Sequence, residues 1–553
     1  MVSLTTDDAF DRSSFVGASG KRDETEESAR VVCDDRGDLF VVVFVWVWIW
    51  IWIWIWVRGE GIIIHQFNIM SSKHRADIVR ELIAACSNDA SRVRTDGESL
   101  SEASEDMGVH RGATPDALVL PRDAEETAAV VRACARRNVI VVPRGAGTGL
   151  EGGCVAYSGG IVLDTRLMKK IEVFPGDGVA KVGAGVLKNE LNKALAPYGF
   201  CFGPDPSSNP SIGGMASTGG SGLSTLKYGT SKENIRSLVV VTPTGDIIKT
   251  RADVRKSSTG YELNAIYLGA EGTLGVITEL TVKLVPLPKV RCGAVVRFPS
   301  VGQAAKTVAE VTALNLGTLL RCELMNDEGI KVTNVVFKTQ LPCEPTLFLE
   351  FVGNTNQSML EDWRAFLERA ERNGADSHTF AKDGAELDEL WDARRGCYLG
   401  AMRYRGLEAG TNAKEKVYVG DVCVPASKLS ECIAATEREF KKARFPCVIC
   451  AHIADGNFHC LIPFQERERA ALLALEDRVI GNAIALGGSA SGEHGVGVGK
   501  QKYLILEHGT AHLDVQRRIK RALDPQNIMN PGKIFSWDPS AGERVPRPRV
   551  AKL

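Results

Sequence analysis

The chain has 553 residues, enough for more than one domain with sizeable hydrophobic cores. Its formal net charge is −1 and its charged residues are intermixed, which gives no case for nucleic acid or an anionic membrane as partner. The 14 cysteines are too sparse for a disulfide scaffold, so we expect reduced thiols and an intracellular protein.

The first seventy residues are unlike the rest of the chain. Residues 5–38 are polar and acid-rich, the opposite of the basic composition of an organelle transit peptide. An uncharged apolar run follows at 39–57, in which Trp alternates with Ile or Val from Trp46 onward. The run is long enough to span a bilayer, but its period of two fits neither a core helix nor a one-sided strand. A membrane anchor and translated repetitive DNA are both open, the second with Met70 as an alternative start.

Strand-like runs alternate with helical stretches and glycine-rich loops from Gly112 to Pro288. Residues 116–120 predict a strand, residues 123–137 a capped amphipathic helix, and residues 139–142 a second strand. Further glycine-rich loops follow.

The loop after the second strand contains Gly147-Thr-Gly149-Leu-Glu-Gly152, which matches the dinucleotide pattern G-x-G-x-x-G. That pattern requires a helix that begins at the last glycine and holds the pyrophosphate. Residues 154–164 predict a loop and a strand instead, so the pattern does not indicate an NAD-binding fold. The backbone N–H groups of such a loop can still hold an anion.

Two more glycine-rich loops occur at 203–222 and 268–277. The first is rich in hydroxyl side chains and nearly free of charge. Because strands flank all three loops, we expect a long cofactor that lies across the ends of several strands, rather than a glycine-rich linker.

Ordinary amphipathic strands and helices fill residues 290–490, as expected of a separate substrate domain. Residues 386–395 predict a helix that carries Arg394 and Arg395 in its last turn. We expect Arg395 to be a solvated helix end.

Three histidines and a carboxylate lie on tight, glycine-rich backbone at 450–459 and 491–497. His452, His459 and Glu493 form a ligand set for a divalent metal, Zn or Mn, that leaves coordination positions open. His494 is then a candidate base beside a substrate on that metal. Asp455-Gly456 predicts a hairpin in which His452 and His459 face each other. We therefore predict an active site here.

A structural zinc site is the competing interpretation of the same region. Cys447, Cys450, His452 and His459 have suitable spacing, but residues 445–450 predict a buried strand and no second thiolate pair follows. The carboxyl-terminal tail carries a separate signal. It ends in Ala-Lys-Leu553, one small residue away from the peroxisomal Ser-Lys-Leu address, which predicts a peroxisome or related organelle, with the mitochondrion as the alternative.

Several of these segments resemble a known family. Residues 142–152, 206–222, 228–234 and 269–275 resemble the FAD domain of the vanillyl-alcohol-oxidase type. The elements at 451–459 and 492–497 narrow the likeness to the FAD-linked D-2-hydroxyacid dehydrogenases, over residues 115–535.

The resemblance implies an α+β fold in which a two-subdomain FAD-binding domain precedes an α+β substrate domain. The expected divisions are a non-homologous extension at 1–69, the FAD-binding domain at 113–288, the substrate and metal domain at 289–500, a segment at 501–536 that returns to the flavin, and a flexible tail at 537–553.

By the same resemblance, the FAD pyrophosphate lies near residues 144–149. Relatives that bind FAD covalently carry His at the position of Thr148, so we expect a noncovalent flavin. The residues expected to bind FAD are Arg144, Gly145, Ala146, Gly147, Thr148, Gly149, Pro206, Ser211, Gly213, Gly214, Ser217, Thr218, Gly219, Glu271, Gly272, Gly275, Val276 and Asn530.

The substrate follows from two further positions in the resemblance. Arg394 falls in the Trp-x-x-Arg element that holds the substrate carboxylate, and a guanidinium suits that geometry. Hydroxyglutarate enzymes carry Lys where this chain has Val419, which favours a short monoacid such as D-lactate over D-2-hydroxyglutarate; glycolate is a further alternative. Alkylglycerone-phosphate synthase is less favoured, because it carries His-His-His where this chain has Gly492-Glu493-His494.

The expected mechanism combines these groups. The metal lowers the pKa of the substrate hydroxyl, Arg394 holds the carboxylate, and His494 takes the proton as hydride leaves for flavin N5. The expected partners are a small 2-hydroxy acid and an electron acceptor: a cytochrome, a quinone, an electron-transfer flavoprotein or oxygen. Two other classes are a soluble NAD dehydrogenase and a membrane-docked respiratory dehydrogenase anchored by residues 39–57.

Overall fold

The computed structural model describes residues 27–33, 39–47, 49–58, 61–66, 72–381, 384–411 and 413–535. The chain divides into two compact units, Met1–Ala76 and Asp77–Leu553. The first unit holds an antiparallel sheet of β1 (Glu27–Cys33), β2 (Leu39–Val47), β3 (Ile49–Arg58) and β4 (Gly61–Gln66).

The apolar run at 39–57 therefore forms two paired strands, β2 and β3, rather than a helix. Among the described residues, no helix has the length and hydropathy that a bilayer crossing needs. The alternative start Met70 and the Ala-Lys-Leu tail fall outside the described ranges.

The second unit begins with helix α1 (Ser72–Ala85), most of which it contains, and a small sheet of order β5-β6-β8-β7. Strands β6 (Ala117–Val119), β8 (Ile161–Asp164) and β7 (Val141–Arg144) are parallel, and β5 (Val93–Arg94) is antiparallel to β6. The predicted helix at 123–137 is confirmed as α3 (Ala124–Arg136). The Asp123 carboxylate accepts the backbone N–H of Glu126 and so caps the first turn of this helix.

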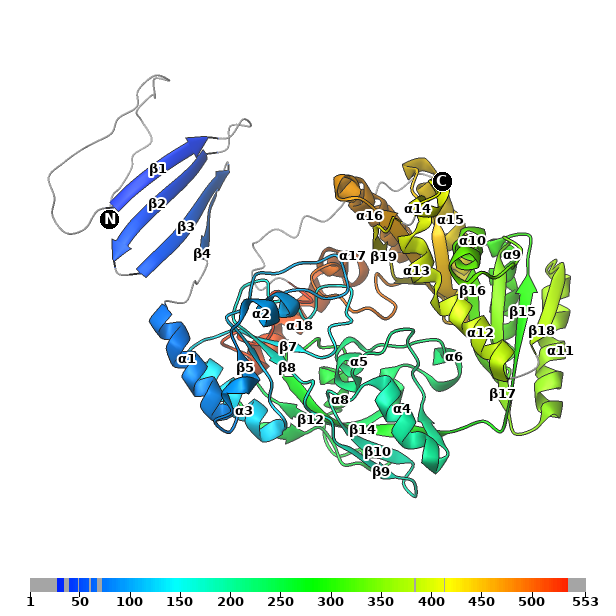
Figure 1. Ribbon diagram of the computed structural model, residues 1–553, viewed down its shortest axis with the longest axis horizontal. Coiled ribbons are helices and arrows are strands. Elements are labelled where there is room, and N and C mark those ends of the chain that lie inside the picture. Colours follow the sequence, from blue (N-terminus) through cyan, green and yellow to red (C-terminus); the bar gives the residue numbers. More distant parts are fainter. Residues whose placement is uncertain are drawn as a thin grey trace. The chain divides into compact units, whose positions relative to one another are not determined.

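A six-stranded antiparallel sheet comes next (Figure 1). Its order is β13 (Ile247–Lys249), β12 (Ile235–Val241), β14 (Val276–Pro286), β10 (Val179–Gly183) and β9 (Ile171–Phe174), with β11 (Phe200–Phe202) also on β14. Helices α4 (Lys188–Leu195) and α5 (Ile212–Thr218) contribute Leu191 and Ile212 to its core. The sequence predicted only a loop where α5 lies.

An eight-stranded antiparallel sheet forms the rest of the unit. Its order is β18 (Ser377–Ala381), β15 (Val290–Arg297), β17 (Thr346–Gly353), β16 (Leu319–Met325), β21 (Val448–His452), β22 (Asn457–Phe464) and β19 (Lys416–Val419), with β20 (Val422–Cys423) on β22.

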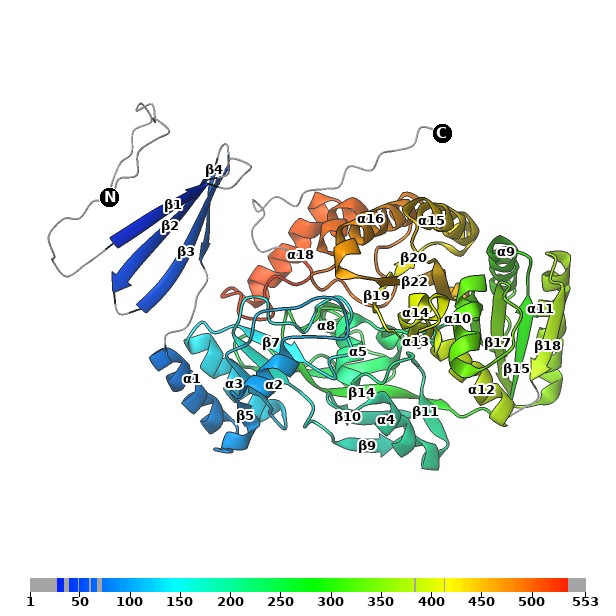
Figure 2. The same ribbon diagram turned by 45° about the horizontal axis from the view of Figure 1, so that its top comes forward.

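Helices cover both faces of this sheet (Figure 2). One face packs on α9 (Val301–Thr312), α11 (Asn356–Arg372), α15 (Leu429–Ala443) and α16 (Arg469–Ala485). The other packs on α10 (Asp327–Phe337), α12 (Gly384–Arg395) and α13 (Cys397–Met402). Leu347 and Leu349 enter the first core and Phe348 the second, as the two-residue period of a strand requires.

The same alternation selects the side chains that point away from α9 and α15. Ala451 and Cys460 enter the first core, whereas Cys450 and Leu461 enter the second. His452 and His459 share the parity of Cys450 and Leu461, so both histidines lie on the inner face of the sheet, which we define as the face toward α12 and α13.

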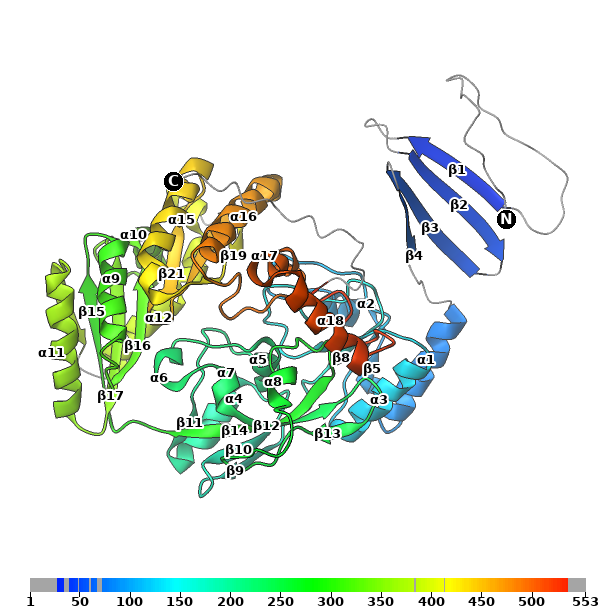
Figure 3. The same ribbon diagram turned by 180° about the vertical axis from the view of Figure 1, so that it is seen from behind.

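The carboxyl-terminal part returns to the glycine-rich half. Helices α17 (Leu504–His508) and α18 (Thr510–Leu523) precede it (Figure 3). Ile519 of α18 packs on the core of the six-stranded sheet. Beyond α18, Val141 of β7 donates its N–H to the carbonyl of Ile528 at 2.8 Å and accepts one from Asn530 at 2.8 Å. This segment therefore extends the small parallel sheet.

Candidate active site

A cavity of about 440 Å³ joins the glycine loops to the inner face of the eight-stranded sheet. Such a volume is typical of small-molecule sites, which span roughly 300–1,000 Å³. The predicted metal ligands His452, His459 and Glu493 line it, and so do the predicted catalytic residues His494 and Arg394. Segments that are distant in the sequence thus meet at one place.

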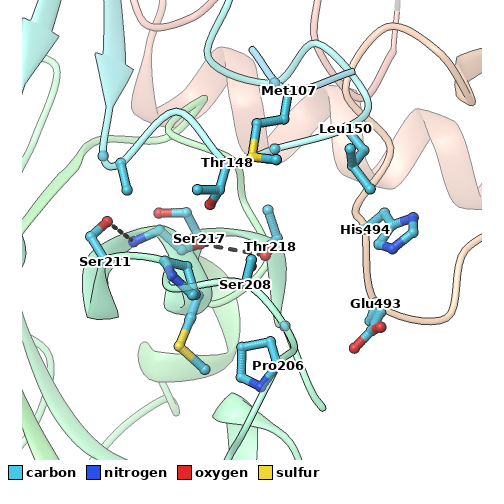
Figure 4. A pocket seen from close by; sticks show the side chains of 18 of the residues that line it. Met107, Thr148, Leu150, Pro206, Ser208, Ser211, Ser217, Thr218, Glu493 and His494 are labelled. Carbon is cyan, nitrogen blue, oxygen red and sulfur yellow. Dashed lines mark hydrogen bonds between the residues drawn. The ribbon is translucent and has the colours of Figure 1, made fainter. Parts of the chain in front are cut away.

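Most residues predicted to bind FAD also line this cavity. They are Arg144, Gly145, Ala146, Gly147, Thr148, Gly149, Pro206, Ser211, Gly213, Gly214, Ser217, Thr218, Glu271, Gly272, Gly275 and Val276. Two predicted residues, Gly219 and Asn530, are not part of the lining. Figure 4 shows Ser211, Ser217 and Thr218 on one side of the cavity, and Glu493 and His494 on the other.

The glycine wall has the shape and chemistry of a phosphate cradle. A Cβ atom at Gly145 would lie 2.2 Å from Ser211 Oγ, so a larger residue there would displace the hydroxyl that caps α5. Small residues leave backbone N–H groups accessible to an anion, and the loops extend toward the histidines. These residues fit a long cofactor that carries a diphosphate.

Asn530 lies behind the lining and holds two glycine loops together. Its Nδ2 donates to the carbonyls of Gly153 at 2.8 Å and Glu271 at 2.7 Å. The carboxylate of Glu271 accepts the backbone N–H groups of Val496 at 2.7 Å and Gly497 at 2.8 Å. The third glycine loop is therefore fixed to the loop that carries Glu493 and His494.

The predicted hairpin is confirmed as β21 and β22, but its turn differs from a two-residue Asp-Gly turn. A 3-10 turn at Ile453–Asp455 is closed by Gly456 at φ +75°. The longer connection pairs His452 with Asn457, two positions away from His459. The histidines are therefore diagonal neighbours rather than direct partners, with ring centroids 5.2 Å apart.

Glu493 lies between the two imidazoles. Its Oε1 is 3.2 Å from His452 Nε2 and 3.1 Å from His459 Nε2, and its other oxygen accepts the hydroxyl of Ser221 at 2.6 Å. Two imidazole nitrogens and one carboxylate, all buried or nearly so, are a ligand set for Zn or Mn with open positions. These residues fit a divalent cation.

A second group of possible ligands, Asp421, His459 and His494, shares one histidine with the first. Asp421 is already occupied, because its Oδ2 accepts the backbone N–H of Gly492 at 2.9 Å and of Glu493 and His494 at 3.0 Å each. Burial alone would raise the pKa of Asp421, but His494 and Lys500 lower it far below its usual value. Asp421 thus fixes the loop, and the group with Glu493 is the better cation site.

The electrostatics of that group favour positive charge. Burial would lower the pKa of His452, but Glu323 and Glu493 hold that pKa well above its usual value. Burial likewise opposes protonation of His459, and its hydrogen bond to Glu493 raises its pKa. A dication bound by neutral imidazoles would supply the positive charge that these protons otherwise supply beside the carboxylates.

His494 differs from its two neighbours. Burial lowers the pKa of His494 to about 4, which the nearby Asp421 opposes without reversing. Its ring stacks on His459 with centroids 4.9 Å apart, and its Nδ1 lies 3.8 Å from Asp421 Oδ2. His494 is therefore neutral at neutral pH and able to accept a proton.

Arg394 projects from the last turn of α12 into the cavity and is almost fully buried. Its guanidinium donates to Glu323, while its Nε–H finds no hydrogen-bond acceptor in the part of the chain that the structure describes. Arg395 was expected to be a solvated helix end. This expectation is wrong, because Arg395 is half-buried and lines the same cavity.

Sequence reasoning missed two acidic residues of the site. Asp421 is two residues from Val419, a position that the family resemblance already singled out, which was a usable signal. Glu323 gives only a weak signal, as the lone acid in the apolar run Leu319–Met325. The alternative structural zinc site gains no support, since no cysteine belongs to either ligand group among the described residues.

Comparisons with known proteins agree with this geometry. A family model described as "FAD binding domain" matches residues 115–251, and one described as "FAD linked oxidases, C-terminal domain" matches residues 287–534. The chain is 37% identical to "D-lactate dehydrogenase [cytochrome], mitochondrial" of Arabidopsis thaliana, over 76% of this chain and 73% of the relative.

Two other relatives show the same pattern. The chain is 36% identical to "Probable D-lactate dehydrogenase, mitochondrial" of Danio rerio, over 78% of this chain and 86% of the relative. It is 32% identical to the glycolate oxidase subunit GlcD of Bacillus subtilis, over 77% and 90%.

Solved structures share the fold. The chain is similar to p-cresol methylhydroxylase with a TM-score of 0.67 at 16% identity, over 84% of this chain and 98% of that one. It is similar to alkyldihydroxyacetonephosphate synthase with a TM-score of 0.65 at 21% identity, over 84% and 87%.

Proposed function

This chain belongs to the FAD-linked D-2-hydroxyacid dehydrogenases, and we propose that it oxidises D-lactate to pyruvate with FAD as the hydride acceptor. One observation carries the proposal: a glycine-lined cavity suited to FAD opens onto His452, His459, Glu493 and His494. We assign FAD binding to residues 113–288 and to the returning segment 501–536, and substrate and metal binding to residues 289–500.

FAD is held without a covalent bond in this proposal. Thr148 lines the glycine wall, and its hydroxyl cannot form the linkage that a histidine forms there in covalent relatives. Acid precipitation should release the yellow colour into the supernatant. A yellow pellet would contradict noncovalent binding.

The other residues of the site have three separate roles: metal binding, carboxylate binding and proton acceptance. His452, His459 and Glu493 hold a divalent cation, Zn or Mn, which supplies Lewis acidity toward the substrate hydroxyl. Arg394 binds the carboxylate and so fixes the α-carbon in place. His494, neutral because it is buried, accepts the hydroxyl proton.

The wall near Arg394 favours a short monoacid. Val419 of β19 and Leu461 of β22 are direct partners in the sheet, and both line the cavity. This pair offers no cation at the position where hydroxyglutarate enzymes carry Lys, which favours D-lactate over D-2-hydroxyglutarate. Glycolate, which lacks only the methyl group, is the alternative that the relatives also support.

Steady-state turnover with an artificial dye acceptor tests the substrate. The panel contains D-lactate, L-lactate, glycolate and D-2-hydroxyglutarate. D-lactate should give the highest kcat/KM and L-lactate should be inactive. Preference for D-2-hydroxyglutarate or for L-lactate would overturn the substrate assignment.

The acceptor and location follow the relatives. The Arabidopsis thaliana relative is named as a cytochrome-linked D-lactate dehydrogenase, which favours a cytochrome as acceptor over a quinone, an electron-transfer flavoprotein or oxygen. The Arabidopsis thaliana and Danio rerio relatives are named as mitochondrial, which favours the mitochondrion as the location of this protein. Nothing beyond the Ala-Lys-Leu tail favours the peroxisome. Cytochrome c reduction by purified protein, and co-fractionation with mitochondrial rather than peroxisomal markers, test these two points.

A further inference from the structure

We propose that Glu323 is a positioning residue that joins metal retention to recognition of the substrate carboxylate, through simultaneous contacts with His452 and Arg394. The inference rests on the proposed function, because it gives both partners of Glu323 a role there. It concerns a residue that touches neither FAD nor substrate and acts through its neighbours.

Glu323 lies at the centre of the inner face, on β16. Its side chain is 1% exposed, and both oxygens are used. Oε1 lies 2.8 Å from His452 Nδ1, and Oε2 accepts from the guanidinium of Arg394. A carboxylate buried this completely is stable only while its partners are present.

The first contact sets the tautomer of His452. An ionised carboxylate can only accept hydrogen bonds, so His452 Nδ1 must carry the hydrogen. In the neutral imidazole that a metal requires, the lone pair of His452 is then on Nε2, which is the nitrogen that faces Glu493 at 3.2 Å. Carboxylates that fix the far nitrogen of a ligating histidine strengthen metal binding, and their loss typically costs about 10–100-fold in affinity.

The second contact sets the orientation of Arg394. Glu323 holds the Nη2 of a guanidinium that lines the cavity, so the orientation of the remaining N–H donors of Arg394 is restricted. One side chain thus determines the position of both the metal ligand and the carboxylate ligand. Because Glu323 projects from one rigid strand, it also fixes the distance between His452 and Arg394. The hydroxyl and the carboxylate of one small substrate can then be bound at the same time.

Glu323→Gln separates the two contacts. The amide oxygen can still accept from Arg394, which leaves the NH₂ group facing His452 Nδ1. A donor there forces the hydrogen onto Nε2, where it blocks the metal. We expect affinity for Zn or Mn, measured by competition with a chelator, to fall about 10–100-fold. The KM for D-lactate at saturating metal should stay within about twofold.

Glu323→Ala removes both contacts. Metal affinity should fall as in Glu323→Gln, and the KM for D-lactate at saturating metal should rise about tenfold, because Arg394 loses the hydrogen bond that orients it. This split between the two variants is a readout that general loss of stability would not produce. FAD content and melting temperature are measured alongside.

Glu350→Gln is the matched control. Glu350 is also 1% exposed and lies on the adjacent strand β17. It accepts from Arg291 at 2.8 Å and from Arg321 at 2.7 Å, so its printed partners are neither a proposed metal ligand nor Arg394. It should bind metal as the unmodified protein does. Equal metal affinity in Glu323→Gln and the unmodified protein, or an equal loss in Glu350→Gln, would overturn the inference. An unmodified protein that binds no divalent cation would overturn the metal site of the proposed function itself.

Discussion

Neighbouring histidines of this site have opposite tendencies to carry a proton. His452 and His459 lie against Glu493, and their pKa values are raised. His494 is one residue from Glu493 in sequence, but burial is the main influence on it and lowers its pKa to about 4. The site therefore separates the two proposed cation ligands from the proposed neutral base, and each role can be tested alone.

His494→Ala tests the base. We expect FAD and metal content to match the unmodified protein, because His494 belongs to the loop fixed by Asp421 through backbone groups. Flavin reduction by D-lactate should slow by about 10²–10⁴-fold, the usual contribution of a general base. Reduction at the unmodified rate would remove His494 from the mechanism.

Glu493→Gln tests the cation site. The amide retains the size of the side chain and its contact with Ser221, but it removes the only carboxylate between the two imidazoles. Elemental analysis should find most of the metal lost while FAD is retained. Ser221→Ala is the control, and it should keep the metal, since Ser221 contacts only the outer oxygen. Full metal occupancy in Glu493→Gln would contradict the assignment.

The sequence alone could identify site residues whose side-chain chemistry is unusual. It could not identify site residues whose role depends on partners that are distant in the sequence. Histidines and a carboxylate in glycine-rich backbone indicated directly the residues that the structure brings together as a possible cation site. Glu323 could not be found this way, because its role arises from strand pairing that brings β16 beside β21. Arg395 was misjudged for the same reason, since a helical pattern does not show what covers the helix end.

At the scale of elements, strand alternation explains why the site is where it is. The two-residue period places His452 and His459 on the inner face while their neighbours fill the opposite core. The sequence predicted α3, α12 and the hairpin correctly. It missed α5, because glycines and hydroxyl residues predict a loop unless tertiary contacts override them. It also missed the longer turn. That turn depends on Gly456, which lies against the backbone of Val424, the residue that follows β20.

Helix α3 supports a stability prediction. Burial alone would raise the pKa of Glu126, but hydrogen bonds from Arg92 and Ser87 lower it to about 2, below its usual value of 4.5. A lowered carboxylate pKa stabilises the fold at pH above 4.5, and that stabilisation is lost as the pH falls toward 2.

Glu126→Ala should therefore destabilise the protein by about 1–3 kcal/mol at neutral pH, because buried Arg92 loses its main acceptor. Denaturant unfolding at several pH values provides the measurement. The difference between variant and unmodified protein should shrink as the pH drops below 4.5 toward 2. A difference that grows with acidity would have the wrong sign.

At the scale of the whole molecule, the described functional residues all belong to the second unit. The cavity lining runs from Met107 to His494, and the segment behind it ends near Lys533. A protein that begins at Met70 should thus bind FAD and metal and oxidise D-lactate within about twofold of the full chain. Loss of FAD from that shorter protein would show that residues 1–69 contribute to the site.

Reduction of bound FAD by D-lactate, followed anaerobically by rapid mixing before and after metal removal, tests the central proposal most directly. D-lactate should bleach the flavin of the complete protein in a single turnover. Metal removal should slow that bleaching strongly, and added Zn or Mn should restore it, while L-lactate leaves the flavin oxidised throughout. A flavin that D-lactate does not reduce, or one that it reduces equally fast without metal, would contradict the proposal.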